Sequence, residues 1–211
     1  KAHGLIPKAE VLGVGWTSDA YHYTSPNPVT IIRALHETIE DAGLKSTDIQ
    51  YINAHGTSTP KGDWTEVKCL REIFGKGIEK IPVSSNKSHL GHTLGATAAI
   101  EAALTIEGMR QGVILPTINH LPDPELADID VVPNVARKQK YEIALSNAFG
   151  FGGTNFHVVL EEWVPGLLTS DSKPFQGVVV TAQGNSPQTE PAGTMQAHTP
   201  VPQSAVVNGG P

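Results

Sequence analysis

The sequence predicts an α/β domain with a mostly parallel or mixed sheet covered by helices, followed by a tail of different composition. Apolar strand-like runs alternate with helical stretches up to about Val164, and the last two runs flank a glycine-rich turn. From Pro165 onward, proline, glycine, serine, threonine and glutamine dominate, and charged residues nearly vanish. We therefore expect a domain over residues 1–164 and a flexible, disordered tail or linker over residues 165–211.

The first expected elements form two strand–helix units. Ala9–Trp16 is apolar with glycine interruptions and predicts a strand. Pro28–Gly43 predicts an amphipathic helix, because its isoleucines and leucine recur at helical spacing and its last residue is a glycine at the usual stop position. Ile49–Ala54 and Trp64–Phe74 repeat this order of strand and helix.

The remaining elements complete the α/β pattern and add an antiparallel pair. Ile81–Ser85 predicts another strand, and Thr93–Gln111 predicts a long helix rich in alanine and leucine. Tyr141–Asn147 and Asn155–Glu162 predict two strands joined by the turn at Gly150–Gly153.

Composition excludes several classes of function. The 211-residue chain has a net charge of −6, which argues against nucleic acid or an anionic membrane as its partner. No run approaches the ~20 apolar residues of a membrane span. The single cysteine, Cys69, excludes an intrachain disulfide and suits the reducing cytoplasm, where we expect the protein to lie. Import into an organelle stays open, because the chain begins with Lys1 and its natural N-terminus is expected to be missing.

Three segments carry candidate chemistry, and each follows a predicted strand, where open α/β sheets place their sites. Asn53–Asp63 places His55 before a loop of glycine, threonine and serine. Asn86–Ala96 places Lys87 and His92 ahead of a helix of small residues. Asn147–Asn155 contains a glycine loop that leads into a strand, which argues against a dinucleotide fingerprint. Taken singly, a histidine such as His55 is more often structural, a lysine such as Lys87 is usually a surface group, and the glycine loop is consistent with a hairpin turn.

In this order the three segments resemble the C-terminal half of the β-ketoacyl-[acyl-carrier-protein] synthases, the condensing enzymes of the thiolase superfamily. The resemblance runs from about Lys1 to Glu162 and includes the loop Ser18–Pro26. It implies the C-terminal half of a thiolase-like fold, with a mixed five-stranded sheet flanked by helices. It also implies a decarboxylative Claisen condensation of an acyl group with malonyl carrier protein, in fatty-acid or polyketide synthesis.

The resemblance also implies roles for individual residues. His55 and His92 match the pair that binds the malonyl thioester carbonyl and stabilises the enolate. Lys87 matches a lysine that holds a polar network, with Glu101 and Asp63 as structural support. The expected substrate-binding residues lie in two of the three segments; they are Thr57 and Thr59 for pantetheine, and Phe149, Phe151 and Gly152 in the glycine loop. Phe151 matches a gating residue whose backbone N–H completes an oxyanion hole.

The nucleophilic cysteine of the family lies in its N-terminal half, which is absent from this sequence. Cys69 stands in the middle of a predicted helix and cannot replace it. The implied partners are a cysteine-bearing half and acyl carrier protein, in a homodimer or heterodimer when complete. No cofactor is implied beyond the phosphopantetheine of the carrier protein, and no metal. We expect this chain alone to be inactive.

Other interpretations stay open at this point. A catalytically silent subunit like a chain-length factor would generally lack the two histidines, and this sequence keeps both. A module that only docks acyl carrier protein is a second alternative. A serine hydrolase lacks its Gly-x-Ser-x-Gly elbow, and a zinc site lacks the usual ligand spacing. Acyl chain length, pathway and oligomeric state are not predicted by the sequence.

Overall fold

The computed structural model describes residues 6–164 of the chain. The tail expected over residues 165–211 lies outside the described residues, so the boundary at residue 164 stays a prediction. Within the described part, no helix is both long and apolar enough to cross a membrane.

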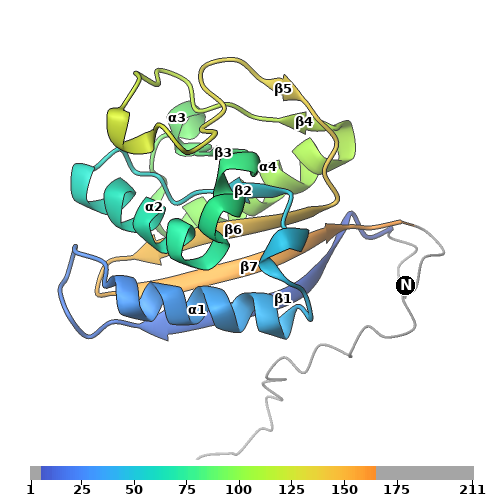
Figure 1. Ribbon diagram of the computed structural model, residues 1–211. Coiled ribbons are helices and arrows are strands. Elements are labelled where there is room, and N and C mark those ends of the chain that lie inside the picture. The colour runs from blue at the N-terminus through green and yellow to red at the C-terminus, as the bar shows by residue number, and fades with distance from the viewer. Residues whose placement is uncertain (1–5, 165–211) are drawn as a thin grey trace, which may run out of the picture. The chain divides into compact units, whose positions relative to one another are not determined.

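A mixed five-stranded sheet forms the centre of the domain (Figure 1). In spatial order its strands are β1 (Ala9–Ser18), β7 (Thr154–Glu162), β6 (Ile143–Gly150), β2 (Tyr51–Asn53) and β3 (Val83–Ser84). The β1–β7 and β7–β6 pairs are antiparallel, whereas β2 pairs with β6 and β3 in parallel. The expected mixed sheet and its closing antiparallel pair are therefore confirmed.

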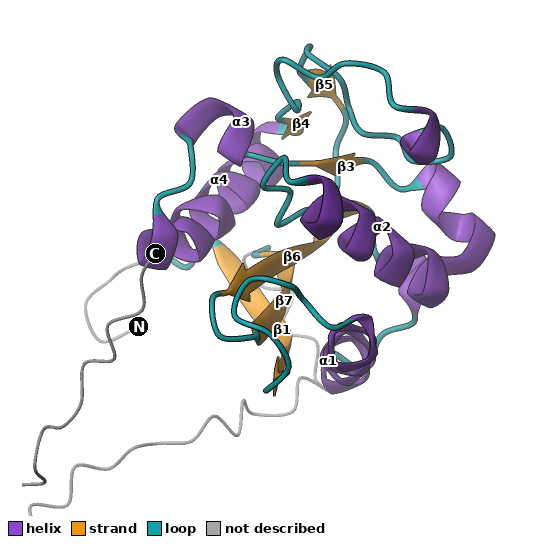
Figure 2. Ribbon diagram, turned by 90° about the vertical axis from the view of Figure 1, so that its left-hand side faces the viewer, coloured by secondary structure: helices purple, strands orange, loops and turns teal. Residues whose placement is uncertain are grey.

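Helices cover both faces of this sheet, as Figure 2 shows. The longer helices are α1 (Pro28–Asp41), α2 (Pro60–Phe74) and α4 (Thr97–Gln111). Helices α1 and α2 pack against one face and α4 against the other, which creates two hydrophobic cores.

Side chains that alternate along the strands supply both cores. On β6, Leu145 belongs to the core beneath α1 and α2, while its neighbour Ala144 belongs to the core beneath α4. On β7, Val159 and Leu160 divide in the same way. Burial on both faces explains the nearly continuous apolar runs, and each buried aliphatic side chain contributes about 1.5–3 kcal/mol to folding.

The glycines that interrupt β1 let α1 approach its backbone. A Cβ atom added at Gly15 would lie 2.2 Å from the carbonyl oxygen of Ala34 on α1, and one added at Gly13 would lie 2.4 Å from the backbone nitrogen of Ala42. Any larger residue would push the helix away from the strand. These glycines therefore set the separation of the two elements.

The α-helix expected over Thr93–Gln111 begins four residues later in the structure and ends where it was expected. A short helix, α3 (Lys87–Leu90), precedes a 3₁₀ turn at Leu94–Ala96, and α4 begins only at Thr97. The later start of α4 follows from the positive φ of Leu94 (53°), which a right-handed helix cannot contain.

Three smaller differences concern element boundaries. Helix α2 begins at Pro60 and not at Trp64, because proline is preorganised for the first helical position. Strands β2 and β3 are shorter than the apolar runs that predict them. An additional antiparallel pair, β4 (Val113–Ile114) with β5 (Arg137–Lys138), is too short to leave a pattern in the sequence.

Candidate active site

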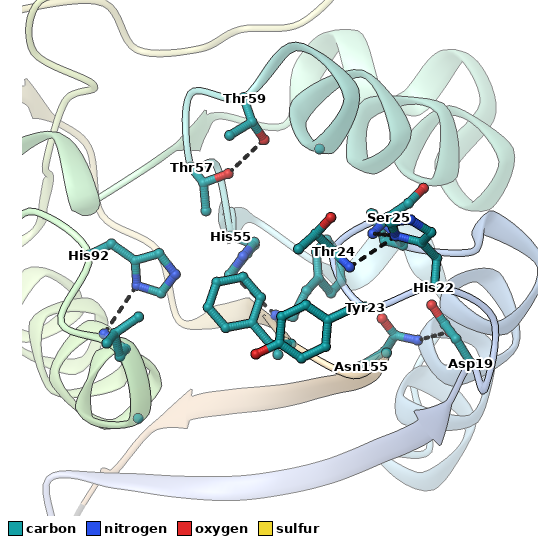
Figure 3. Close-up of a pocket in the computed structure, with 18 residues that line it drawn as sticks. Asp19, His22, Tyr23, Thr24, Ser25, His55, Thr57, Thr59, His92 and Asn155 are labelled. Atoms are coloured by element: carbon teal, nitrogen blue, oxygen red, sulfur yellow. Dashed lines mark hydrogen bonds between the residues drawn. The ribbon is translucent and has the colours of Figure 1, made fainter. Parts of the chain in front are cut away.

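The three candidate segments converge on one cavity of about 510 Å³ (Figure 3). His55 reaches it from the loop after β2, His92 from the loop after α3, and Phe149 from the end of β6. Strands β2 and β6 are parallel neighbours, so the segments that follow them meet at the same edge of the sheet. The edge predicted from the sequence is therefore the edge at which the cavity lies.

His55 is fixed by bonds to both its ring and its backbone. Its Nδ1 accepts a hydrogen bond from the backbone N–H of Phe149 at 3.2 Å. A nitrogen that accepts carries no proton in the neutral ring, so the proton of His55 is on Nε2. Its backbone N–H donates to a carboxylate oxygen of Glu66 at 2.9 Å, and the N–H of Gly56 donates to the other oxygen at the same distance.

His92 has the same tautomer but different supports. Its Nδ1 accepts from the backbone N–H of Leu94 at 3.2 Å and lies 3.2 Å from the hydroxyl of Thr97. Its Nε2 therefore carries the proton as well. The rings of His55 and His92 approach edge to face, with 5.7 Å between their centroids, and both line the cavity.

Both imidazoles are neutral near pH 7. Burial, with the positive charge of Lys87 and the neighbouring His92, lowers the pKa of His55 to about 3. Burial and the Lys87 charge also lower the pKa of His92. Two neutral rings that each present an N–H can donate hydrogen bonds to a developing oxyanion without losing a proton.

Lys87 forms a buried ion pair with Glu101. Its ammonium lies 2.8 Å and 3.1 Å from the two carboxylate oxygens, and both side chains are buried. Burial raises the pKa of Glu101, and the Lys87 ammonium opposes that shift. Burial also raises the pKa of Asp63, whose Oδ1 has no hydrogen-bond partner among the described residues. The structure thus pairs Lys87 with Glu101, while no hydrogen bond or ion pair among the described residues joins Asp63 to Lys87.

Most of the other expected residues line the cavity. The hydroxyls of Thr57 and Thr59 lie 3.0 Å apart at its wall, and Phe151 lies at its edge. Gly152 is not among the lining residues; its N–H donates to the carbonyl of Tyr23 at 2.9 Å.

The loop Ser18–Pro26 forms the wall of the cavity opposite His92 (Figure 3). Tyr23 stacks on Phe151 with ring centroids 5.4 Å apart and planes 12° from parallel. Asp19 anchors the loop, since its carboxylate accepts from the side-chain amide of Asn155 at 2.6 Å and its N–H donates to Gly153 at 2.7 Å. Sequence reasoning recognised this loop as part of the motif but did not single out either residue.

Sequence reasoning also missed Glu66, Asn147 and His157. Glu66 is buried, and it accepts from the side-chain amide of Asn147 at 3.0 Å in addition to the two backbone groups. Asn147 in turn contacts the Nδ1 atom of His157 at 2.7 Å. The available signals were weak: Glu66 stands one helical turn after Asp63, and Asn147 begins the third motif.

Cys69 is unsuited to nucleophilic catalysis. It lies within α2, fully buried, and burial raises the pKa of its thiol to about 12. Across residues 6–164, no group of three or more histidine, cysteine or acidic side chains could hold a metal ion.

A mixed sheet between two helical layers, with the active-site segments at its strand ends, defines the C-terminal half of a thiolase-like fold. Residues 8–120 match the family described as the C-terminal domain of β-ketoacyl synthase. The chain belongs to this family.

Three relatives illustrate the match. The 3-oxoacyl-[acyl-carrier-protein] synthase 2 of Staphylococcus aureus (strain COL) is 44% identical over 166 residues, which are 77% of this chain and 40% of that protein. The crystal structure of a β-ketoacyl synthase from Burkholderia phymatum has a TM-score of 0.72 at 41% identity, over 77% of this chain and 40% of that one. A type II polyketide ketosynthase in complex with its acyl-carrier protein (AntDE:AntF) has the same TM-score and coverage at 30% identity. The chain thus spans about 40% of the length of these relatives.

Proposed function

We propose that this chain supplies the histidine and lysine half of a β-ketoacyl-[acyl-carrier-protein] synthase active site. The reaction is the decarboxylative condensation of an acyl group with malonyl carrier protein. One observation carries the proposal: His55 and His92 both accept a hydrogen bond at Nδ1, so both present an Nε2–H, and both line the same cavity.

The chemistry follows from these two donors. When the bond between the α-carbon and the carboxylate of the malonyl thioester breaks, carbon dioxide leaves and the electron pair forms an enolate. The negative charge develops on the thioester oxygen, where the two N–H groups stabilise it. The α-carbon then attacks the acyl thioester on the nucleophilic cysteine, the new carbon–carbon bond forms, and the thiolate leaves. One such donor is worth about 2.7–4 kcal/mol to the transition state.

The remaining residues support this step. Burial, with the charge of Lys87 as a smaller contribution, lowers the pKa of both imidazoles, and Glu101 pairs with Lys87 in the buried site. Thr57 and Thr59 bind the pantetheine arm, and the backbone N–H of Phe151 contributes to the oxyanion hole for the acyl group. The phosphopantetheine belongs to the substrate, so the residues described need no cofactor of their own.

The proposed partners are acyl carrier protein and a segment that carries the nucleophilic cysteine. A relative 30% identical to this chain is a ketosynthase in complex with its acyl-carrier protein, which supports the first. The burial and raised thiol pKa of Cys69 support the second, since this cysteine is not available as the nucleophile.

The proposal is tested with three variants of this chain, each combined with a cysteine-bearing half. His55→Ala and His92→Ala should each lower decarboxylation of malonyl carrier protein by about 10²–10³-fold, the cost of one lost oxyanion donor. Transfer of the first acyl group to the cysteine should change less, because that step uses backbone donors. Carbon dioxide release measures the first step, and labelled acyl carrier protein measures the second.

His89→Ala is the matched control. His89 lies between His55 and His92 in sequence, within the second candidate segment, but its Nε2 contacts the carbonyl of Pro116 at 2.8 Å and it does not line the cavity. It should change either step little. The chain without the cysteine-bearing half should form no ketoacyl product. Normal decarboxylation by both site variants, or an equal loss in the control, would contradict the proposal.

A further inference from the structure

We propose that His157 is a positioning residue for His55. It does not line the cavity, and it fixes the orientation of His55 through its contacts with Asn147 and Phe149. The inference rests on the proposed function, because it concerns how well His55 presents its N–H to the substrate.

His157 is an unusual core residue. It lies on β7, directly opposite Asn147 on β6, and is completely buried on the side of the sheet covered by α1 and α2. Burial lowers its pKa to about 3, so the ring is neutral. Its Nε2 has no hydrogen-bond partner among the described residues. An unsatisfied buried polar atom lowers the stability of the fold, and an apolar side chain at this position would avoid that loss.

The other ring nitrogen of His157 has a defined partner. The amide nitrogen of Asn147 donates to Glu66, so the oxygen of that amide is the acceptor that faces His157. His157 therefore donates its Nδ1–H to Asn147 at 2.7 Å. This bond fixes the rotation of the Asn147 amide and so keeps its N–H directed at Glu66.

Glu66 transmits this constraint to the loop of His55. Both of its oxygens accept backbone N–H groups, from His55 and Gly56. The loop turns sharply there, with positive φ at Gly56 (34°) and Ser58 (61°). Positive φ costs energy at a non-glycine residue such as Ser58 and persists there only where surrounding bonds hold it. A freely rotating Asn147 amide would remove one of the donors that hold the Glu66 carboxylate in place.

Phe149 provides a second contact between the two histidines. Its ring contacts both, with centroids 4.9 Å from His55 and 5.8 Å from His157. Its backbone N–H is also the group that fixes the tautomer of His55. His157 thus contacts both residues through which β6 holds His55, one by hydrogen bonding and one by packing.

The test compares three substitutions of His157 in the synthase assembled with its cysteine-bearing half. The amide of His157→Asn places an N–H close to the position of Nδ1. His157→Gln places its amide near Nε2, and His157→Leu supplies volume without a donor. We expect Leu and Gln to lower decarboxylation by about tenfold, the effect of one hydrogen bond, with acyl transfer to the cysteine within about twofold. His157→Asn should stay within about threefold of the parent.

A second measurement does not depend on activity. In the full chain labelled with ¹⁵N-histidine, the Nδ1 resonance of His55 should report a single tautomer in the parent and in His157→Asn, and a mixture in His157→Leu and His157→Gln. If His157→Leu does not fold, His157→Gln carries the test. The thermal unfolding temperature of each variant is measured together with its rates of decarboxylation and acyl transfer.

Three results would overturn the inference: equal loss in both half-reactions, His157→Asn as damaging as His157→Leu, or an unchanged His55 resonance in the Leu and Gln variants. His55→Ala, measured in parallel, shows whether a negative result concerns the positioning role of His157 or the proposed function itself. Normal decarboxylation by His55→Ala would refute the proposed role of His55 and leave the resonance to decide whether His157 positions it.

Discussion

His55 and His92 contribute the same ring to the same cavity, yet they are supported in opposite ways. His55 follows a strand of the sheet, and its ring accepts from Phe149, which is 94 residues away in sequence. His92 lies on an exposed loop, and its ring is held by Leu94 and Thr97, within five residues of it.

The difference shows that one chemical task can be met by two kinds of support. The position of His55 depends on strand pairing, so it has the rigidity of the core. The position of His92 depends on a local turn whose residues 91–96 are all exposed, so local contacts alone fix it. The two histidines should therefore respond differently to changes in stability, pH and local bonding.

The largest effect is expected for Lys87, whose charge acts on both histidines. Lys87→Ala leaves the carboxylate of Glu101 buried without its partner, and removal of one member of a buried pair costs about 3–5 kcal/mol. We expect a loss of this size in the free energy of unfolding, measured for the full chain in urea. The double variant Lys87→Met/Glu101→Leu should recover most of it, since it buries no charge. Equal stability of the single and double variants would show that the pair is not coupled.

An intermediate effect is expected on the pH dependence of stability. His55 has a pKa of about 3 in the fold and about 6.5 in the unfolded chain, so between these values the unfolded state binds the extra proton. Its contribution is present above about pH 6.5, and the free energy of unfolding falls as the pH drops, by up to about 1.4 kcal/mol per pH unit.

The His55→Asn variant should therefore show a shallower loss of stability between pH 7 and pH 4 than the parent chain, measured by urea unfolding at several pH values. His92→Asn should keep nearly the parent slope, because His92 is exposed and its shift is smaller. Identical slopes for the two variants would remove the distinction between a core-held and a loop-held histidine.

The smallest effect is expected for Thr97→Val. The substitution keeps the shape of the side chain and removes one of two contacts to Nδ1 of His92, while the N–H of Leu94 remains. We expect decarboxylation by the assembled synthase to fall severalfold and at most about tenfold, the effect of one hydrogen bond. Thr105→Val on the same helix, also buried, is the control for loss of a hydroxyl. A loss as large as that of His92→Ala would mean that Thr97 alone fixes the ring.

The order of the elements was predictable, but some of their boundaries were not. Apolar patterns predicted both the helix over residues 28–43 and the closing strand pair: burial on one face leaves helical spacing, and burial on both faces leaves a nearly continuous apolar run. The break before α4 was missed, since left-handed backbone at Leu94 is not typical of leucine and leaves no signal. The two-residue strands β4 and β5 are too short for any periodicity.

Some of the candidate site residues were likewise predictable from the sequence, and others were not. His55, Lys87 and His92 stood out because each follows a predicted strand. In the structure His55 and His92 line one cavity, and Lys87 lines a second pocket that His92 also borders. Glu66 and His157 were missed, because a buried acid on a helix and a histidine in a strand have no distinctive neighbours in sequence.

The sequence by itself determined the α/β class, the three motif segments and the edge of the sheet at which they meet, because these depend on local spacing and strand order. Only the tertiary structure decided which nitrogen of each histidine carries the proton, and which buried side chains hold the His55 loop. Those properties depend on contacts such as Phe149 with His55 and Asn147 with Glu66, across 94 and 81 residues. Such contacts are set by strand register and helix packing, which no local pattern specifies.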